Sequence, residues 1–274
     1  MRHTKTTGVD APKASLCDVE RYWSAHLNLT QFLRGQEVAS EIGSPAFFAA
    51  VRRTLQRFPY KEALLNDIWA NRSGDRLLEV GCGLGADLAS LAQRGFQVVG
   101  VDLSARAAAL GALHLRTLCL PGIVEVADAE RLPFADATFD EVFSSGVFQH
   151  TPDPQRAIDE AIRVLRPGGQ MTVVLYHRHS WFWVLSRVGK THVEFQEEEA
   201  PIVEAYSRRE LRRMFAALVA LTITMEHYRP LRTPRAGIVP GLYNRVLVPV
   251  AEALPAPVLR PFGFHAVIRG RKPG

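Results

Sequence analysis

A run of apolar residues that breaks into alternating glycines is the part of this chain best suited to bind a small molecule. Residues 77–80 read as a buried strand that carries one acid, Glu79, and glycines follow at positions 81, 83 and 85. The next residues, 86–92, are compatible with a helix. A strand, a glycine turn and a helix in this order make a site where backbone N–H groups face a ligand and no Cβ blocks its approach.

This segment alone leaves the ligand open. Gly81-x-Gly83-x-x-Ala86 also satisfies the dinucleotide fingerprint, and Asp102 lies about where a ribose-binding acid should fall. A dehydrogenase therefore stays an alternative, disfavoured because Glu79 would have no role in it. The acidic segment that begins at Asp128 would also have no role in a dehydrogenase.

Four segments that follow one another in a fixed order narrow the choice of ligand. They are residues 79–85, 101–104, 128–134 with Phe139-Asp140, and 165–169. Through them the chain resembles the class I S-adenosylmethionine-dependent methyltransferases, in particular the type 11 group that contains the ubiquinone and menaquinone C-methyltransferases. The likeness covers roughly residues 75 to 177. It implies S-adenosylmethionine as cofactor and no metal.

The resemblance also implies which residues meet the cofactor. Glu79 would reach the ammonium end of the methionine moiety, Asp102 the ribose hydroxyls, and Asp128 with the Ala129 backbone the adenine. A carboxylate suits the ribose because it only accepts hydrogen bonds, and charge-assisted bonds are the stronger kind. The predicted cofactor-binding residues are Glu79, Gly81, Cys82, Gly83, Gly85, Asp102, Leu103, Asp128, Ala129 and Ser145.

The acceptor side is expected around the loop after the fourth strand, residues 145–150. His150 is the predicted base, because histidine suits proton transfer near neutral pH. Stacking on the adenosine and capping of the helix at residue 154 stay open as alternatives for it. His177, which ends the fifth strand, is the second catalytic candidate. The predicted substrate-binding residues are Tyr22, His26, Phe148, Gln149, Tyr176 and Trp181.

Alternating strand and helix patterns must position these residues. Strands are expected at 76–81, 97–102, 123–128, 140–145 and 170–177, with helices near 85–94, 104–118 and 154–165. The alternation favours a parallel sheet covered on both faces. A helix at 207–217 and strands at 221–225 and 264–268 follow. The resemblance implies a Rossmann-like, doubly wound α/β fold with a seven-stranded sheet, mostly parallel, whose last strand is antiparallel and lies beside the fifth.

Three regions are expected along the chain. Residues 1–74 form an N-terminal tail and helical cap, with helices near 18–26, 45–55 and 63–70. Residues 75–177 form the Rossmann-like cofactor-binding core. Residues 178–274 carry substrate-side inserts and the C-terminal strands of the same domain. The inserts, 178–206 and about 229–262, together with the cap, are expected over the active site, at the carboxyl edge where open parallel sheets bind ligands.

Composition limits the functional class. The 274 residues are 47% hydrophobic and 22% charged, which is ordinary for a soluble globular protein. No apolar stretch is long enough to cross a bilayer, and the N-terminus lacks the apolar core of a signal peptide. Three separated cysteines exclude a disulfide framework and a cysteine-rich zinc site, so a cytoplasmic location is expected. The net charge of +5 comes without a dense basic patch, so no nucleic-acid partner is expected.

The sequence thus predicts a methyltransferase that transfers a methyl group to a small organic acceptor by in-line displacement. One alternative is methylation of a membrane-associated quinone or lipid, with peripheral contact through Ile238–Leu254. Another is a non-catalytic protein that binds S-adenosylmethionine. The acceptor atom, the need for a base and the oligomeric state are left open.

Overall fold

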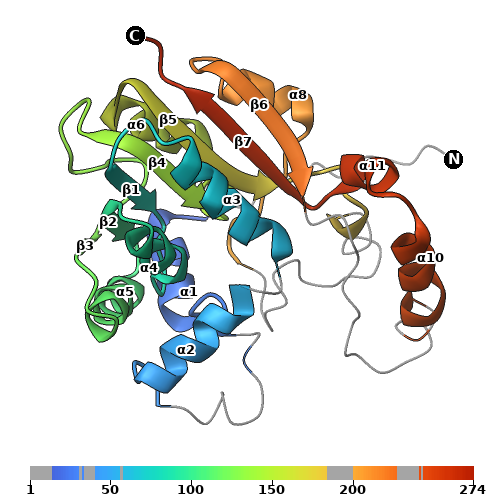
Figure 1. Ribbon diagram of the computed structural model, residues 1–274, viewed down its shortest axis with the longest axis horizontal. Helices are drawn as coiled ribbons and strands as arrows, with labels where there is room; N and C mark the ends of the chain where they lie inside the picture. The colour runs from blue at the N-terminus through green and yellow to red at the C-terminus, as the bar shows by residue number, and fades with distance from the viewer. Residues whose placement is uncertain are drawn as a thin grey trace, which may run out of the picture.

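The computed structural model describes residues 14–30, 33, 41–55, 58–183, 200–226, 241 and 243–274. Its centre is a seven-stranded sheet in the order β3-β2-β1-β4-β5-β7-β6 (Figure 1). The strands are β1 (Arg76–Val80), β2 (Gln97–Asp102), β3 (Ile123–Val126), β4 (Phe139–Ser145), β5 (Leu165–Tyr176), β6 (Val219–Glu226) and β7 (His265–Arg271). Only β7 runs antiparallel to its neighbours, and it lies between β5 and β6. The predicted fold class is confirmed.

Helices connect the strands as the alternating pattern predicts. They are α4 (Ala86–Gln93), α5 (Ala105–Thr117), α6 (Pro154–Val164) and α8 (Arg208–Met214). Asp153 begins α6 by accepting a hydrogen bond from the Arg156 N–H at 3.1 Å, with Pro154 in the first turn. The helix ends at Val164, but β5 starts at Leu165 rather than at the predicted residue 170. Leu165 pairs with Phe139 ahead of a register shift.

An apolar layer packs each face of the sheet against helices. Both faces can be apolar because successive side chains of a strand point to opposite faces. Leu77 packs with residues of α4, α5 and the preceding helix α3 (Pro59–Ala70). Leu78 packs on the other face with residues of α6 and α8. The side chains of both leucines are fully buried. The turn that follows β1 is therefore anchored by a strand held from both sides.

The N-terminal helices rest on the glycine turn. Helix α1 (Leu16–Ala25) begins at a capping box made by Ser15, and α2 (Pro45–Thr54) begins at Ser44, whose side chain accepts from the Phe47 N–H at 3.1 Å. An apolar cluster joins α2 to Leu84 of the turn. On the opposite side, Ser24 of α1 donates to Ser104 at 2.9 Å. The cap thus packs on the glycine turn and is hydrogen-bonded to the N-cap residue of α5.

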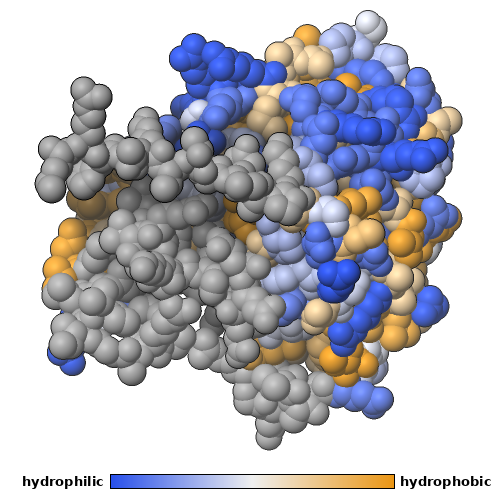
Figure 2. Space-filling model, turned by 180° about the vertical axis from the view of Figure 1, so that it is seen from behind, coloured by the Kyte–Doolittle hydropathy of each residue, from blue (hydrophilic) through white to orange (hydrophobic). Residues whose placement is uncertain are grey.

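The C-terminal insert contains helices in its described part. They are η5 (Tyr243–Leu247), α10 (Val248–Ala253), α11 (Ala256–Leu259) and η6 (Arg260–Phe262), and α10 and α11 project at one side in Figure 1. The acidic run at 197–199 and the residues from 227 to 240 lie outside the described part. Seen from behind, hydrophilic and hydrophobic residues are interspersed on the described surface (Figure 2). No helix in the described part is long and apolar enough to cross a membrane.

Candidate functional site

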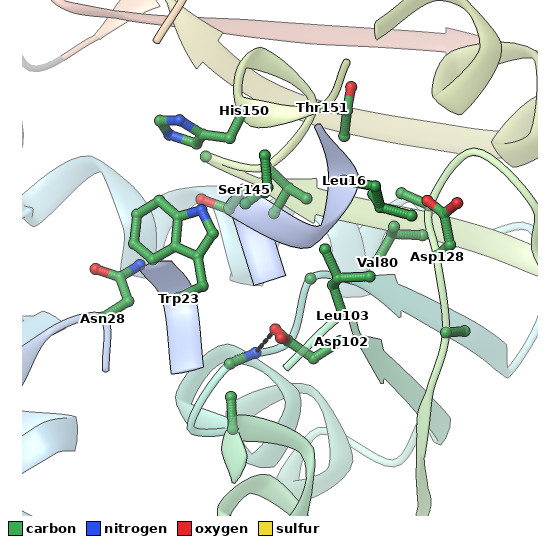
Figure 3. A pocket seen from close by; sticks show the side chains of 18 residues that line it. Leu16, Trp23, Asn28, Val80, Asp102, Leu103, Asp128, Ser145, His150 and Thr151 are labelled. Carbon is green, nitrogen blue, oxygen red and sulfur yellow. Dashed lines mark hydrogen bonds between the residues drawn. The ribbon is translucent and has the colours of Figure 1, made fainter. Parts of the chain in front are cut away.

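A pocket opens at the carboxyl ends of β1 to β4, where the strand order reverses between β1 and β4 (Figure 3). This is the position at which open α/β sheets bind ligands. Its wall combines the strand ends with α1 and the loop after β4. It is lined by Leu16, Val19, Trp23, Asn28, Val80, Gly81, Gly83, Asp102, Leu103, Ala107, Ala127, Asp128, Ala129, Ser145, Gly146, Val147, His150 and Thr151.

The three glycines of the turn have different reasons to be glycine, although all have a positive φ. A Cβ on Gly81 would lie 2.1 Å from a methyl group of Val147, and one on Gly85 would lie 3.1 Å from the Gly111 Cα. A Cβ on Gly83 would meet no protein atom within 4 Å. Since Gly83 lines the pocket, a side chain there would enter the space of a ligand.

The N–H groups of the turn are mostly used inside the protein, whereas the sequence predicted that they face a ligand. Those of Gly81 and Cys82 both donate to the Val101 carbonyl, at 2.7 and 3.0 Å. The Gly85 N–H donates to the Cys82 carbonyl at 2.8 Å, and Gly83 donates to a carboxylate of the second strand. The turn is therefore unlike a phosphate-binding loop, which leaves such donors open.

Asp102 is the carboxylate that Gly83 binds. Its Oδ2 accepts from the Gly83 N–H at 2.8 Å, and its Oδ1 accepts from the Ser104 N–H at 2.9 Å. Burial raises the pKa of Asp102, and the two hydrogen bonds oppose that rise. Leu103 lines the pocket beside it. Each carboxylate oxygen keeps further acceptor capacity for a ligand.

The third strand brings an acid and a buried alanine to the same pocket. Asp128 and Ala129 both line it, and Oδ1 of Asp128 accepts from the Glu130 N–H at 2.9 Å. This bond forms a tight turn that aims residues 127–129 at the cavity. Ser145, at the end of β4, closes the same wall.

Glu79 and Cys82 lie behind the pocket wall. The Glu79 side chain is buried, and its Oε2 atom has no hydrogen-bond partner in the structure. Burial, and then the negative charge of Asp87, raise the pKa of Glu79 well above its ordinary value. Cys82 packs into the apolar layer under α4, so only its backbone belongs to the turn.

His150 forms the side of the pocket opposite the glycine turn. Its Nδ1 lies 2.7 Å from the Ile202 carbonyl oxygen, and its ring meets the edge of Trp23 at a centroid distance of 5.1 Å. A carbonyl only accepts, so Nδ1 of a neutral His150 carries the proton and Nε2 carries the lone pair. The centroid of the Tyr176 ring lies 5.8 Å from that of His150. The arrangement can take a proton at Nε2.

Other predicted residues lie outside the pocket lining. Helix α1 points Leu16, Val19 and Trp23 toward the cavity, at the spacing of three and four residues that shares one helical face. Tyr22 and His26 lie on another face, where their rings stack with centroids 4.3 Å apart. Phe148 and Gln149 are fully buried, and neither polar atom of the Gln149 amide has a hydrogen-bond partner in the structure. The remaining predicted residues also contact other parts of the protein. Tyr176 stacks on Phe264, and Trp181 packs against Phe182. The Nδ1 of His177 lies 3.1 Å from the Gly263 carbonyl oxygen.

Sequence reasoning did not single out Asn28, Leu16 or Val19, which also line the pocket. For Leu16 and Val19 on α1, helical spacing back from Trp23 is the signal that could have found them. Lys61 of α3 and Asp87 of α4 also escaped prediction, and the structure joins them in a buried ion pair next to Glu79.

Comparison with known proteins finds a family that matches the middle part of this chain. Residues 78–173 match the family described as a methyltransferase domain. A ubiquinone biosynthesis O-methyltransferase of Idiomarina loihiensis is 32% identical over 44% of this chain and 50% of its own. The 27-O-demethylrifamycin SV methyltransferase of Amycolatopsis mediterranei is 36% identical over 37% of this chain and 39% of its own. The chain thus spans half or less of the length of these two relatives.

Solved structures extend the fold likeness beyond the matched segment. The geranyl diphosphate C-methyltransferase of Streptomyces coelicolor, solved with Mg²⁺, geranyl diphosphate and S-adenosyl-L-homocysteine, superposes with a TM-score of 0.61. The superposition covers 96% of this chain and all of that one, at 20% identity. At this identity the likeness concerns the fold.

Proposed function

We propose that the protein transfers a methyl group from S-adenosylmethionine to a small organic acceptor, because residues 78–173 match the family described as a methyltransferase domain. The observation that carries this proposal is the pairing of Gly83 with Asp102 at the pocket wall. Gly83 leaves open space in the pocket where another residue would have a Cβ, and Asp102 supplies a carboxylate held in a fixed orientation. A bound nucleoside needs the space for its body and the carboxylate for its ribose hydroxyls.

The residues fit the cofactor at each of its parts. Asp102 would accept hydrogen bonds from the ribose hydroxyls. Asp128 would accept from the adenine amine, and the Ala129 N–H would face a ring nitrogen. The unpartnered Glu79 Oε2 suits the methionine ammonium. Glu79, on β1 just before the glycine turn, would have no role in binding a pyrophosphate, which disfavours a dinucleotide.

The chain's own residues would position and deprotonate the acceptor. When bound, S-adenosylmethionine supplies a methyl carbon on a sulfonium, which an acceptor lone pair attacks as the carbon–sulfur bond breaks. Leu16, Val19 and Trp23 would exclude water from this reaction. His150 would hold the acceptor in line and take its proton on Nε2 where the acceptor has one to lose.

An apolar or aromatic acceptor is the class that the surroundings of His150 favour. Trp23 and Tyr176 flank its ring, and Phe264 stacks on Tyr176 at 4.6 Å. Phe148 lies buried in the same loop as His150. The side-chain amide of Gln149, which is buried and has no hydrogen-bond partner in the structure, could bind an acceptor oxygen after a rotamer change.

One observation favours a second candidate, an acceptor taken from a membrane surface. Large apolar side chains are exposed in the C-terminal helices and the link between α10 and α11: Val246, Val250, Leu254, Val258 and Phe262. Exposed apolar side chains of this kind suit peripheral contact with lipid. Salt-dependent co-sedimentation with anionic vesicles would support this candidate, and no sedimentation at low salt would remove it.

Calorimetry and an acceptor screen test the main proposal. We expect S-adenosylmethionine and its demethylated product to bind and NAD to be inert, whereas binding of NAD alone would overturn the assignment. Labelled methyl groups offered with phenols, amines, thiols and carboxylates should then identify the acceptor class. Cofactor binding without transfer to any of them would favour a non-catalytic binder.

A further inference from the structure

A buried group of three charges stands beside the glycine turn, brought together by three elements. Lys61 comes from the first turn of α3, Glu79 from β1, and Asp87 from the first turn of α4. The Lys61 Nζ forms an ion pair with Oδ2 of Asp87, and the two side chains are only 13% and 8% exposed. Helices α3 and α4 pack against each other at this point.

The group contains two carboxyl groups, those of Glu79 and Asp87, but one ammonium, that of Lys61. Lys61 neutralises Asp87, while Oε2 of Glu79 and Oδ1 of Asp87 have no hydrogen-bond partner in the structure. Asp102 adds a further negative charge that acts on Glu79. A buried carboxylate without a partner is costly, which is why the pKa of Glu79 is raised, and a second cation beside it would stabilise its charged form.

Burial and the negative charge of Asp87 raise the pKa of Glu79, and the positive charge of Lys61 lowers it. If Asp87 no longer held Lys61 by the ion pair, Glu79 would be the carboxylate left for that ammonium. A bond that only joined α3 to α4 would not need a third, unpaired carboxylate at its side.

We propose that Lys61 and Asp87 are positioning residues for the cofactor: by holding Lys61, Asp87 keeps the Glu79 carboxylate available for the ammonium of the methionine moiety. This inference rests on the proposed function. It predicts that the effect of Asp87 depends on the amino-acid end of the ligand and on the presence of Lys61.

The test compares three full-length proteins and three ligands by calorimetry. The proteins are the wild type, Asp87→Asn, and the double variant Lys61→Met with Asp87→Asn. The ligands are S-adenosylmethionine, S-adenosylhomocysteine, and 5′-methylthioadenosine, which lacks the amino-acid end. Asp87→Asn should weaken the first two by about tenfold, the factor of one charge-assisted hydrogen bond, and leave the third within about twofold. The double variant should regain wild-type affinity.

Each outcome is decisive. Unchanged affinity of Asp87→Asn for S-adenosylmethionine overturns the inference, and so does an equal loss for all three ligands, which a merely structural pair would give. Should Asp87→Asn not fold, the double variant decides, because weak S-adenosylmethionine binding with normal 5′-methylthioadenosine binding would contradict the idea. A wild type that binds none of the ligands would instead refute the proposed function.

Discussion

The N–H of Gly83 donates to Oδ2 of Asp102 at 2.8 Å, which ties the turn after β1 to the end of β2. The other oxygen of the carboxylate is held by the Ser104 N–H at 2.9 Å. The carboxylate therefore has its orientation before any ligand arrives. Preorganisation of this kind lowers the entropy cost of binding.

Asp102→Ala should weaken binding of S-adenosylmethionine by about 1.5–3 kcal/mol, the value of hydrogen bonds to a charged group. Calorimetry measures the change. Asp153→Ala is the matched control, because Asp153 caps α6 away from the pocket and its loss should cost about 1 kcal/mol of stability without affecting affinity. Equal affinities of Asp102→Ala and wild type would remove Asp102 from the cofactor site.

Gly83→Ala should abolish most cofactor binding while the protein stays folded, because the added Cβ meets only the pocket. Gly83→Val should do the same more severely. Gly95→Ala is the control, since Gly95 also has a positive φ, of 94°, and open space around its Cβ position, but does not line the pocket. Circular dichroism checks the fold and calorimetry the affinity. Similar affinity losses in both variants would point to backbone strain instead of ligand contact.

The sheet and the glycine turn could be predicted because their signals are local. Apolar runs mark the strands, Asp153-Pro154 marks a helix start, and φ-permissive glycines mark the turn. The start of β5 could not be predicted, because the strand begins five residues earlier than expected, before Pro167 and two glycines that suggest a loop. Pairing of Leu165 with Phe139 of β4 overrides that local preference.

The site was less predictable where it depends on partners distant in sequence. Ile202, which orients His150, is 52 residues away from it, and Lys61 is 26 residues from Asp87. No spacing rule links such positions. On α1, the rotation of the helix over the sheet places Trp23 in the pocket and leaves Tyr22 outside its lining.

Glu141 should make stability depend on pH. It is buried on β4, where its Oε1 accepts from the Ser73 N–H at 2.7 Å, and burial raises its pKa from 4.5 to about 7. Below about pH 4.5 the carboxyl is protonated in both states; as pH rises through about 7, the folded state loses the stability that the proton provided. The wild type should thus lose up to about 3 kcal/mol from this group between pH 4.5 and 8.

Glu141→Gln keeps the acceptor for Ser73 and removes the titration. Its melting temperature should match the wild type near pH 5 and exceed it at pH 8, in thermal unfolding at both pH values. Glu125→Gln, on the exposed face of β3, serves as the control and should shift neither value. A stabilisation by Glu141→Gln that is the same at both pH values would show that ionisation of Glu141 is not its cause.

The role of His150 can be separated from cofactor binding. His150→Ala removes the Nε2 lone pair that the Ile202 contact leaves available, so turnover should fall about a hundredfold or more if the acceptor must lose a proton. Affinity for S-adenosylmethionine, measured by calorimetry, should be nearly unchanged. Among phenolic acceptors, a fluorinated analogue that ionises near neutral pH should recover much of the lost rate, because it needs no base.

His177→Ala supplies the comparison, since His177 does not line the pocket and its Nδ1 faces the Gly263 carbonyl. Burial lowers the pKa of His177, which keeps it neutral in the fold. Its substitution should reduce stability and leave the turnover of the folded enzyme intact. If His150→Ala instead lost cofactor affinity and kept its turnover, His150 would belong to the adenosine site. Loss of turnover in His177→Ala alone would move the base to the end of β5.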